Sequence, residues 1–570
     1  MSGQCTSLAS TWPLLVLQRS DVAHLADHPA LTRGRRIYFV DPGLLDEAAT
    51  LGLTALEFKP LRVSPDHQAQ ATTEAFSLAT LLDMRLTIER QRLWPGSLVQ
   101  GWDVGLFFLA LQRLLLARQL GERIVDSFDE PYLAVLRPNA VQQMYFDSCL
   151  VTDLVVAQAP QRLLVLSAYD HVRWSRSDAY DKVFDGAGIR QAMASGLVSL
   201  VTHVPTCFYD RSWLMEQVTR RHRFSLDLPS PFWDVPLHRG QLPMLTHGQS
   251  PPTALALAHR YAERARAVLV ELLDPLMPQP QARRQQLDAW AQRCIWQALN
   301  FQALREGLVG LRPHFLLSDQ DVGLNGPIFS VANELGSAIT VSPHSGYPSM
   351  AVPHGRNVTV AERAGWGTRA RTVLGQAVAM RPVKLQPGPG RRSVQRVQRV
   401  CLMLNAMQTE GLSYVDAPSL AAFYRPLLAF CQSRGVELAL RAKPGAPALN
   451  VLALLLHMRA EDLLGNARKP LRDLALECEL CVAFGDPTIG VAPFLDAGSL
   501  VLQVGPQQWP TDYLVSLPLI HDRVIQSLPM SDGLHQVQRW VDDPAVFQAA
   551  CQRQNEAYDQ RTALAEEHLF

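Results

Sequence analysis

Residues 484–505, FGDPTIGVAPFLDAGSLVLQVG, form the stretch that decides the fold class. The apolar run 480–484 predicts a strand that ends at the polar turn Gly485-Asp486-Pro487-Thr488. An apolar helix is predicted over 488–497, a second turn follows at Ala497-Gly498, and 500–504 read as another strand. Two short apolar runs joined through a helix are typical of parallel strands, because a parallel pair needs a long crossover connection.

The same alternation extends in both directions along the chain. It predicts an α/β protein whose parallel sheets are covered by helices on both faces. The pattern restarts after one break, which predicts two doubly wound Rossmann-like domains facing a cleft. The predicted strands are 36–40, 55–60, 132–136, 162–167, 197–203, 314–319, 338–342, 397–404, 436–440, 480–484 and 500–504. The predicted helices are 70–90, 104–120, 253–274, 280–308, 325–336, 417–434 and 488–497.

The break gives the predicted domain boundaries. Segment 381–396, RPVKLQPGPGRRSVQR, is rich in Pro, Gly and Arg, and residues 386–396 are the predicted linker. Before it, residues 1–385 form an N-terminal domain with extra helices inserted at about 253–308. After it, residues 397–535 form a second domain, and 536–570 are a C-terminal helical segment.

Composition excludes several classes of protein. The 570 residues are 48% hydrophobic, which is globular rather than disordered. Lys plus Arg and Asp plus Glu each number 53, so bulk charge gives no reason to expect a nucleic-acid partner. No apolar run is long enough for a membrane span, and the N-terminus lacks the features of a signal peptide. Nine scattered cysteines fit a reduced, cytoplasmic protein.

Polar residues follow the predicted strands of the second domain. Asp486 and Thr488 come after 480–484, Arg441 and Lys443 after 436–440, and Glu410 lies in the loop after 397–404. The carboxyl ends of parallel strands share one edge of a sheet, where ligands of such folds bind. A helix N-terminus with Thr488 and Gly490 suits a phosphate, although Thr488 or Asp486 could equally be a plain helix cap.

The N-terminal domain supplies candidate acid and base groups. His344 and Ser345 follow the strand 338–342, and His354 stands in a second Pro-His turn. Asp103 and Asp321 are further candidates for the base, although Asp103 also reads as a helix cap and Asp319-Gln320-Asp321 as a polar turn. Cys478-x-x-Cys481 has no second Cys pair and no nearby His, and Asp319-Gln320-Asp321 has the character of a polar turn, so no metal is expected.

These motifs together resemble a known enzyme family, the GT-B glycosyltransferases of bacterial surface polysaccharides. The likeness is to the capsule sialyltransferase-like and glycerophosphate-transferase-like groups, and it covers about residues 311–506. Pro343-His344-Ser345-Gly346 or Pro353-His354-Gly355 stands where the family has a Gln-His-Gly turn, and Gly365-Trp366-Gly367 follows as its Trp-Gly element. Lys443-Pro444 stands at the family's donor-phosphate His-Pro turn, and Asp486-Pro487-Thr488 at its Ser-Ser/Thr helix start.

The resemblance implies sugar transfer from a nucleotide-activated donor to a glycan, glycolipid or protein acceptor, without a metal or a separate cofactor. The donor site would comprise Arg441, Lys443, Asp486, Thr488, Gly490 and Glu410, with His344, Asp103 or Asp321 on the catalytic side. Lys443 replaces the family's His, and Asp486 replaces a hydroxyl residue and would repel a phosphate. A degenerate binding protein without turnover and a glycerophosphate transferase therefore remain alternatives.

One basic cluster raises the question of a membrane partner. Arg391, Arg392, Arg396 and Arg399 lie at the predicted linker, where they could contact an anionic membrane or an acceptor lipid. Such a cluster is also typical of a solvated linker surface. We therefore expect a cytoplasmic protein, with peripheral contact to the inner membrane as the alternative. The sequence does not predict an oligomeric state.

Overall fold

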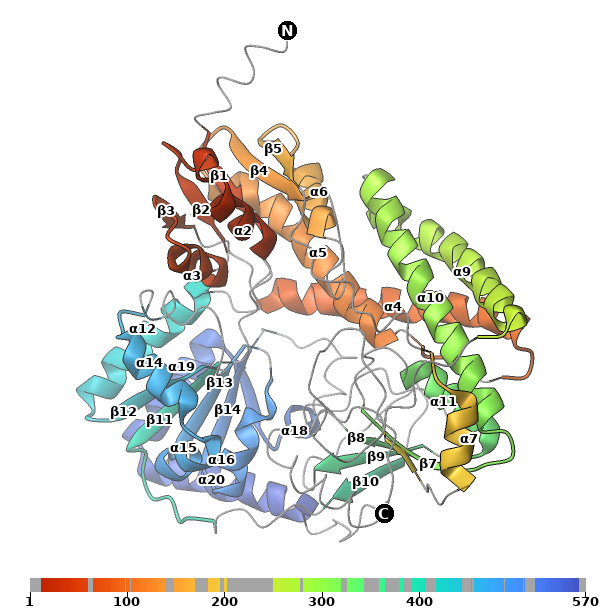
Figure 1. The fold of residues 1–570 in the computed structure, drawn as a ribbon. Coiled ribbons are helices and arrows are strands. Elements are labelled where there is room, and N and C mark those ends of the chain that lie inside the picture. The colour runs from red at the N-terminus through yellow and green to blue at the C-terminus, as the bar shows by residue number, and fades with distance from the viewer. Residues whose placement is uncertain are drawn as a thin grey trace.

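The computed structural model describes most of the chain. The described residues are 12–40, 42–59, 65–97, 99–102, 104–138, 148–169, 183–194, 199–201, 250–276, 280–318, 325–342, 358–363, 379–383, 391–404, 417–442, 453, 456–485, 487–505, 507 and 518–562. Within them the chain forms three five-stranded sheets whose neighbouring strands are all parallel (Figure 1). The predicted α/β class with covered parallel sheets is confirmed, and the part before the linker holds two sheets rather than one.

The first sheet has the strand order β3-β2-β1-β4-β5. Its central strand β1, Leu14–Val16, is the short apolar segment near the N-terminus, and all three of its residues are fully buried. The other strands are β2 (Ile37–Phe39), β3 (Leu56–Phe58), β4 (Leu133–Pro138) and β5 (Leu163–Tyr169). The associated helices are α2 (Arg19–Asp27), α3 (Pro42–Thr50), α4 (Pro65–Leu93), α5 (Val104–Ser127) and α6 (Ser148–Gln158).

The second sheet has the order β10-β9-β8-β7-β6, so each strand lies next to the strand that precedes it in the chain. Its edge strand β10, Ala379–Val383, contains Pro382, and an edge tolerates proline because one side of the strand needs no ladder hydrogen bonds. The other strands are β6 (Ser199–Val201), β7 (His314–Ser318), β8 (Ile339–Ser342) and β9 (Val358–Arg363). The helices are α7 (Gly186–Ala194), α9 (Pro252–Leu273), α10 (Pro280–Gly307) and α11 (Asn325–Leu335).

The third sheet has the order β12-β11-β13-β14-β15, and it contains the stretch that decides the fold. Its strands are β11 (Arg399–Leu404), β12 (Glu437–Arg441), β13 (Leu480–Phe484), β14 (Leu500–Gly505) and β15 (Gln526–Pro529). Its helices are α12 (Ala417–Ser433), α14 (Ala460–Arg468), α15 (Leu471–Glu477), α16 (Ala492–Asp496), α18 (Pro518–His521), α19 (Met530–Asp542) and α20 (Pro544–Thr562).

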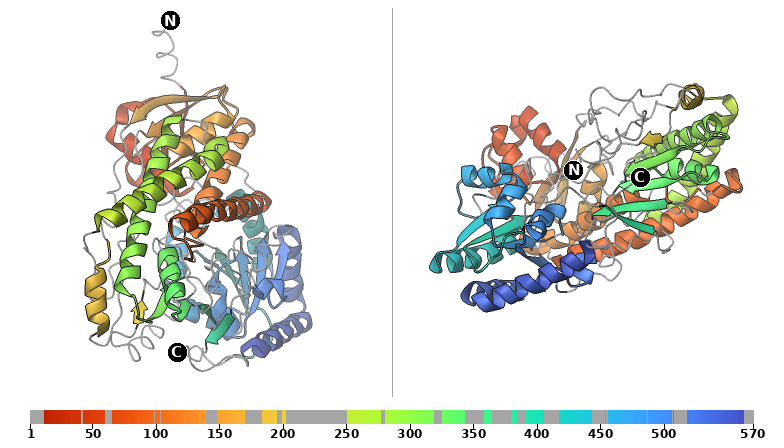
Figure 2. Two further views of the ribbon diagram at one scale, coloured as in Figure 1. Left: turned by 90° about the vertical axis from the view of Figure 1, so that its right-hand side faces the viewer. Right: turned by 90° about the horizontal axis from the view of Figure 1, so that it is seen from below.

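The hydrophobic cores show how the sheets are grouped. One cluster of buried side chains runs from Leu15 of the first sheet through α4, α5, α9 and α10 to Phe315 and Ile339 of the second sheet. The long helices predicted as an insertion therefore join the two N-terminal sheets. The third sheet has separate clusters on its two faces, one containing Leu402 and the other Cys401. Figure 2 shows the C-terminal part in blue beside the green second sheet. The exact domain boundaries stay a prediction.

Candidate functional site

The strand order of the third sheet marks a candidate ligand site. From β11 the chain continues to β12 on one side of that strand, and it then crosses to β13 on the other side. Ligands of open parallel sheets bind in the crevice where the strand order reverses in this way. Leu404 and Phe484 are register partners at the ends of these two strands. The ends of β11 and β13 thus lie side by side. Glu410 and Asp486, which follow these strands in the sequence, lie outside the described residues.

A buried glutamine holds the turn after β13. Gly485 has a φ of +83°, a conformation that favours glycine, and its N–H donates to the carbonyl oxygen of Val504 over 2.9 Å. The carbonyl oxygen of Gly485 accepts from Nε2 of Gln503 over 2.7 Å. Gln503 is 2% exposed within the otherwise apolar strand β14. Gln503 was not among the predicted site residues, and the signal in the sequence is a single amide within an apolar strand.

Thr488 and Gly490 bring the next turn against the end of β11. Oγ1 of Thr488 accepts a hydrogen bond from the N–H of Gly490 over 3.2 Å. A Cβ on Gly490 would lie 2.7 Å from Sδ of Met403, so glycine permits this close approach. The predicted helix over 488–497 is a short 3₁₀ turn at Ile489–Val491 followed by the five-residue α16. Thr488 acts here as a local cap, and its role in donor binding stays a prediction.

Arg441 has partners within the protein. At the end of β12 it is 6% exposed, and its Nη1 donates to the carbonyl oxygens of Ala442, over 2.8 Å, and of Ala467 in the last turn of α14. The guanidinium thus satisfies carbonyl groups at a helix C-terminus. A contact with a donor phosphate stays a prediction for Arg441, and Lys443 lies outside the described residues.

The corresponding crevice of the first sheet is filled by its own side chains. Its order reverses between β1 and β4, and there Nε2 of Gln18 donates to Oγ1 of Thr152 over 3.2 Å. Oδ2 of Asp21 accepts from the N–H groups of Leu17 and Gln18, over 3.1 and 3.2 Å. Two N–H groups at the start of α2 therefore donate to a carboxyl group of the protein itself.

The same carboxyl group should make stability depend on pH. Burial raises the pKa of Asp21 from 3.8 to about 7, against the opposing effect of the 2.5 Å hydrogen bond from the Tyr169 hydroxyl. The pKa of Asp21 is higher in the folded protein than in the unfolded chain, where it is about 4, so protonation of this carboxyl group favours folding. Its full contribution to the free energy of unfolding is present below about pH 4. It is lost as the pH rises from about 4 through about 7.

Asp21→Asn is expected to flatten this part of the pH profile, since an amide keeps an acceptor for the backbone and cannot ionise. Hydrogen exchange of the β1 and β4 amides at several pH values measures the local effect. His24 is a second titratable group close to this site, since its ring stacks on Tyr169 with centroids 4.2 Å apart and on His28 with centroids 4.1 Å apart, and His24→Gln serves as the control. An unchanged slope in Asp21→Asn would contradict the assignment.

The second sheet brings together the chain segments of the catalytic candidates. β7 and β8 are neighbours, with Ser318 paired to Ser342 at their ends. Asp321 follows the first strand, while His344 and Ser345 follow the second. These three residues, and His354 farther along, lie outside the described residues. Because β7 and β8 end side by side, the segments that follow them start at the same edge of the sheet. The roles of these residues stay predictions.

The segment leading to Asp103 reaches the same edge of the second sheet. Trp102 packs on the first turn of α11, which follows β7, so closely that a Cβ on Gly326 would lie 2.2 Å from Cα of Trp102. Nε1 of Trp102 donates to Oγ of Ser330 in α11 over 2.9 Å. Asp103, the next residue, is outside the described ones, and Trp102 places the segment before it against the first turn of α11.

A buried ion pair contacts the segment that leads to Asp103. Nη1 of Arg90 donates to Oδ1 of Asp83 over 3.0 Å, and both side chains are almost fully buried. Oδ2 of Asp83 accepts from the N–H of Gly101 over 2.8 Å, and the Arg90 guanidinium lies 4.8 Å from the ring centroid of Trp102. The two charges thus position the backbone immediately before Asp103.

The basic cluster at the predicted linker is mostly neutralised. Arg391 pairs with Asp559, and Arg399 pairs with Glu437 and Glu477. Arg392 contacts Glu479 and several carbonyl oxygens. These contacts favour the interpretation of a linker surface bound to its own domain. Membrane contact stays untested. Within the described part of the chain, no helix is both long and apolar enough to cross a bilayer.

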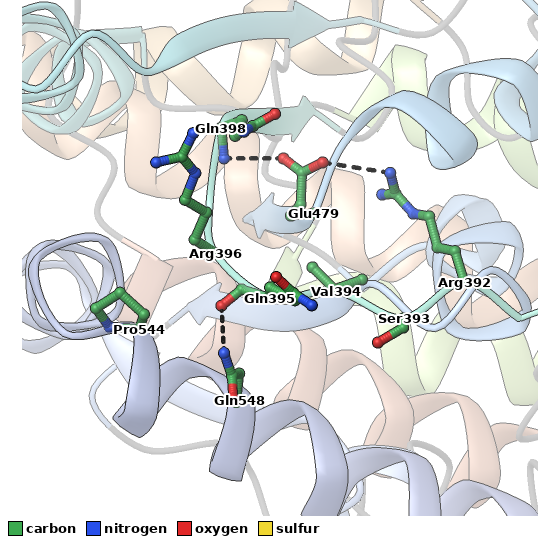
Figure 3. A pocket seen from close by; sticks show the side chains of 9 residues that line it. All are labelled: Arg392, Ser393, Val394, Gln395, Arg396, Gln398, Glu479, Pro544 and Gln548. Carbon is green, nitrogen blue, oxygen red and sulfur yellow. Dashed lines mark hydrogen bonds and ion pairs between the residues drawn. The ribbon is translucent and has the colours of Figure 1, made fainter.

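A surface pocket lies beside this segment, at the amino end of the third sheet. Its volume is about 580 Å³, and the carboxylate of Glu479 in its wall accepts from the N–H of Gln398 (Figure 3). The same carboxylate accepts from the N–H of Arg399. Gln548 of α20 donates to the carbonyl oxygen of Gln395 over 2.7 Å. The pocket adjoins the strand beginnings, so it is at the opposite edge from the predicted donor site.

The cysteines of the third sheet are buried thiols. Cys401, Cys478 and Cys481 are all fully buried, and a hydrogen bond with Cys401 together with burial raises the pKa of Cys478. A thiol held in its protonated form is a poor metal ligand and a poor nucleophile. Among the described side chains, no group of His, Cys, Asp and Glu has an arrangement suited to a metal ion.

Comparison with known proteins gives structural neighbours only. No protein-family model and no curated protein sequence matches the chain. SsfS6, a glycosyltransferase of Streptomyces sp. SF2575, is 14% identical over 64% of this chain and 96% of its own, with a TM-score of 0.30. The spinosyn rhamnosyltransferase SpnG, complexed with spinosyn aglycone, is 15% identical over 64% and 97%, at 0.33. The glycosyltransferase VinC, in complex with DTDP, is 14% identical over 64% and 95%, at 0.27.

TM-scores of 0.27 to 0.33 assign neither a fold nor an activity to the chain. The α/β architecture described above rests instead on the strand orders and registers of the chain itself.

Proposed function

We propose that the chain is a glycosyltransferase that uses a nucleotide-activated sugar. The observation that carries the proposal is the reversal of strand order between β11 and β13, where the turn containing Gly485, Thr488 and Gly490 packs on Met403. A nucleotide bound in this crevice would have N–H groups and the Thr488 hydroxyl near its phosphates. In the first sheet, two N–H groups at the start of α2 donate to the carboxyl group of Asp21 instead.

The proposed reaction needs three roles. An acceptor hydroxyl attacks the anomeric carbon, the bond from that carbon to the phosphate oxygen breaks, and the nucleotide leaves with the electron pair. Lys443 and the turn at Thr488 would stabilise the negative charge that develops on the leaving phosphate, without a requirement for a metal. Asp103, Asp321 or His344 would take the proton of the acceptor hydroxyl. The acceptor would be a glycan, a glycolipid or a protein.

A thermal-shift panel of nucleotides and nucleotide sugars tests the donor site. We expect one nucleotide class to raise the melting temperature of the wild type, and ligand at about 100 times Kd adds about 2.7 kcal/mol. Lys443→Ala and Thr488→Ala should each lose that shift. Gly490→Ala should also weaken it, because the new methyl group meets Sδ of Met403 at 2.7 Å.

Gly465→Ala is the matched control, because nothing lies within 4 Å of a Cβ at that position in α14. It should keep the full nucleotide shift and gain roughly 0.5–1 kcal/mol of helix stability. If no nucleotide stabilises the wild type, the donor site is wrong. If a nucleotide binds but its sugar donor is never hydrolysed or transferred, the chain is a binding protein. Release of glycerophosphate instead of a sugar would point to the related transferase chemistry.

A further inference from the structure

Helix α4 carries an exposed apolar stripe that no described element covers. Leu81, Met84 and Ile88 are 45%, 47% and 51% exposed, although they stand on a helix whose opposite side, at Leu82 and Leu86, is fully buried. In the right-hand view of Figure 2 this orange helix runs along the lower margin of the molecule. Large apolar side chains grouped on one exposed helix face are typical of an interaction surface.

The spacing of the stripe is that of a coiled-coil seam. Its exposed residues alternate steps of three and four along the helix, which keeps one face toward a partner helix. The centre is apolar and the ends are polar. We call the following set the α4 stripe: Glu74, Ser77, Leu81, Met84, Ile88 and Gln91, with the exposed Arg92 beside its last member.

The charges at the two ends of the α4 stripe are opposite. Glu74 has no ion-pair partner among the described residues. At the other end Glu89 is shared between Arg92 and Arg264, so this end keeps one net positive charge. A partner helix that complements the stripe must be acidic opposite Arg92, basic opposite Glu74 and apolar between them. The α4 stripe of a second copy, running antiparallel, has these properties.

We propose that the α4 stripe is a self-association surface, in which two copies of the chain pair antiparallel through α4. In the register that sets Leu81 against Met84 of the second copy, Ser77 faces Ile88 and Glu74 faces Gln91, next to Arg92. A parallel pair would instead set Glu74 against Glu74 and Arg92 against Arg92, which is unfavourable. The stripe is only about 27 Å long, so the dimer is weak and its population depends on concentration.

Sedimentation equilibrium of the full chain, from about 1 to about 100 µM at low salt, tests the proposal. The weight-average mass should rise from the 63.3 kDa of one chain toward twice that value. Leu81→Glu with Met84→Glu should hold the protein at the mass of one chain, and an unchanged circular-dichroism spectrum shows that it is folded.

Charge exchange gives the sharper test. Glu74→Arg and Arg92→Glu should each weaken the dimer about tenfold, because each places like charges together at both ends of the pair. An equal mixture of these two variants should recover the mass increase, since every end contact then joins opposite charges. Glu556→Arg, the same change at an exposed site on α20, should behave as the wild type.

Three results would overturn the proposal. The first is a single-chain mass at every concentration. The second is a dimer that the stripe variants leave unchanged. The third is a wild type that never dimerises but binds anionic lipid vesicles, together with loss of that binding in the Leu81→Glu, Met84→Glu variant. That result would assign the stripe to a membrane surface instead. None of these results depends on whether a nucleotide binds the third sheet.

Discussion

Gly326→Ala is expected to destabilise the N-terminal part by about 3 kcal/mol or more, which is the upper range for added volume in a packed core. The new Cβ would lie 2.2 Å from Cα of Trp102, and a backbone atom cannot rotate out of the way. Trp102 is itself fully buried among the rings of Trp94, Tyr261 and Phe301. Either α11 or the start of α5 must therefore move.

Urea unfolding measures the loss of stability, and hydrogen exchange locates it in α5 and α11. The proposed catalytic edge should be affected as well, because residue 103 follows Trp102 and the loop before α11 carries residue 321. Gly465→Ala again serves as the control, since a Cβ there meets nothing within 4 Å. A Gly326→Ala protein as stable as that control would show that the close packing of Trp102 on α11 is wrong.

Arg90→Met is expected to cost about 3–5 kcal/mol, because the Asp83 carboxylate stays buried after its ion-pair partner is removed. Among the described residues that carboxylate keeps its contacts to Thr87 and to the N–H of Gly101. Asp83→Asn leaves the guanidinium in the core beside Tyr261, whose hydroxyl lies 2.7 Å from Nε of Arg90. Either change should also loosen the backbone before Asp103.

A double-mutant cycle separates the pair from its surroundings. The combined Arg90→Met and Asp83→Asn variant should cost less than the sum of the single changes by about 1–3 kcal/mol. The exposed pair of Arg434 and Asp542, joined over 2.6 Å, is the matched control, and Arg434→Met should leave the melting temperature unchanged. Additive losses at Arg90 and Asp83 would show that the two groups do not act as a pair.

Most strands of the three sheets could be predicted from periodicity. Residues 480–505 form β13, a 3₁₀ turn, α16 and β14, and the two strands are register partners, as a βαβ unit requires. Four strands were missed, and one of them, β9, has six residues and lies inside the second sheet between β8 and β10. The other three are short or lie at edges. β1 has three residues, while β10 and β15 are edge strands that contain proline and polar residues. Edge strands bury one side only, so their apolar pattern is weak.

The grouping of the sheets could not be predicted in the same way. Helices α9 and α10 read as an insertion, but their buried side chains join the cores of the first and second sheets. Contacts between residues so far apart in sequence leave no local periodicity. Two contacts at the site follow from no local pattern. Arg441, a predicted site residue, reaches a carbonyl oxygen 26 positions away in α14, and Gln503, which was not predicted, reaches the turn at Gly485.

The attachment of residues 391–398 to the third sheet also determines how the C-terminal half could be produced as a separate fragment. The backbone N–H of Arg392 donates to Ala497 over 3.2 Å, and its side chain contacts Glu479, Ser499 and the carbonyl oxygens around Cys478. A fragment that starts at the predicted domain boundary, Val397, would lose these contacts of Arg392. An independently folding fragment should therefore include Arg391 and Arg392, and it should keep α20, whose Asp559 pairs with Arg391.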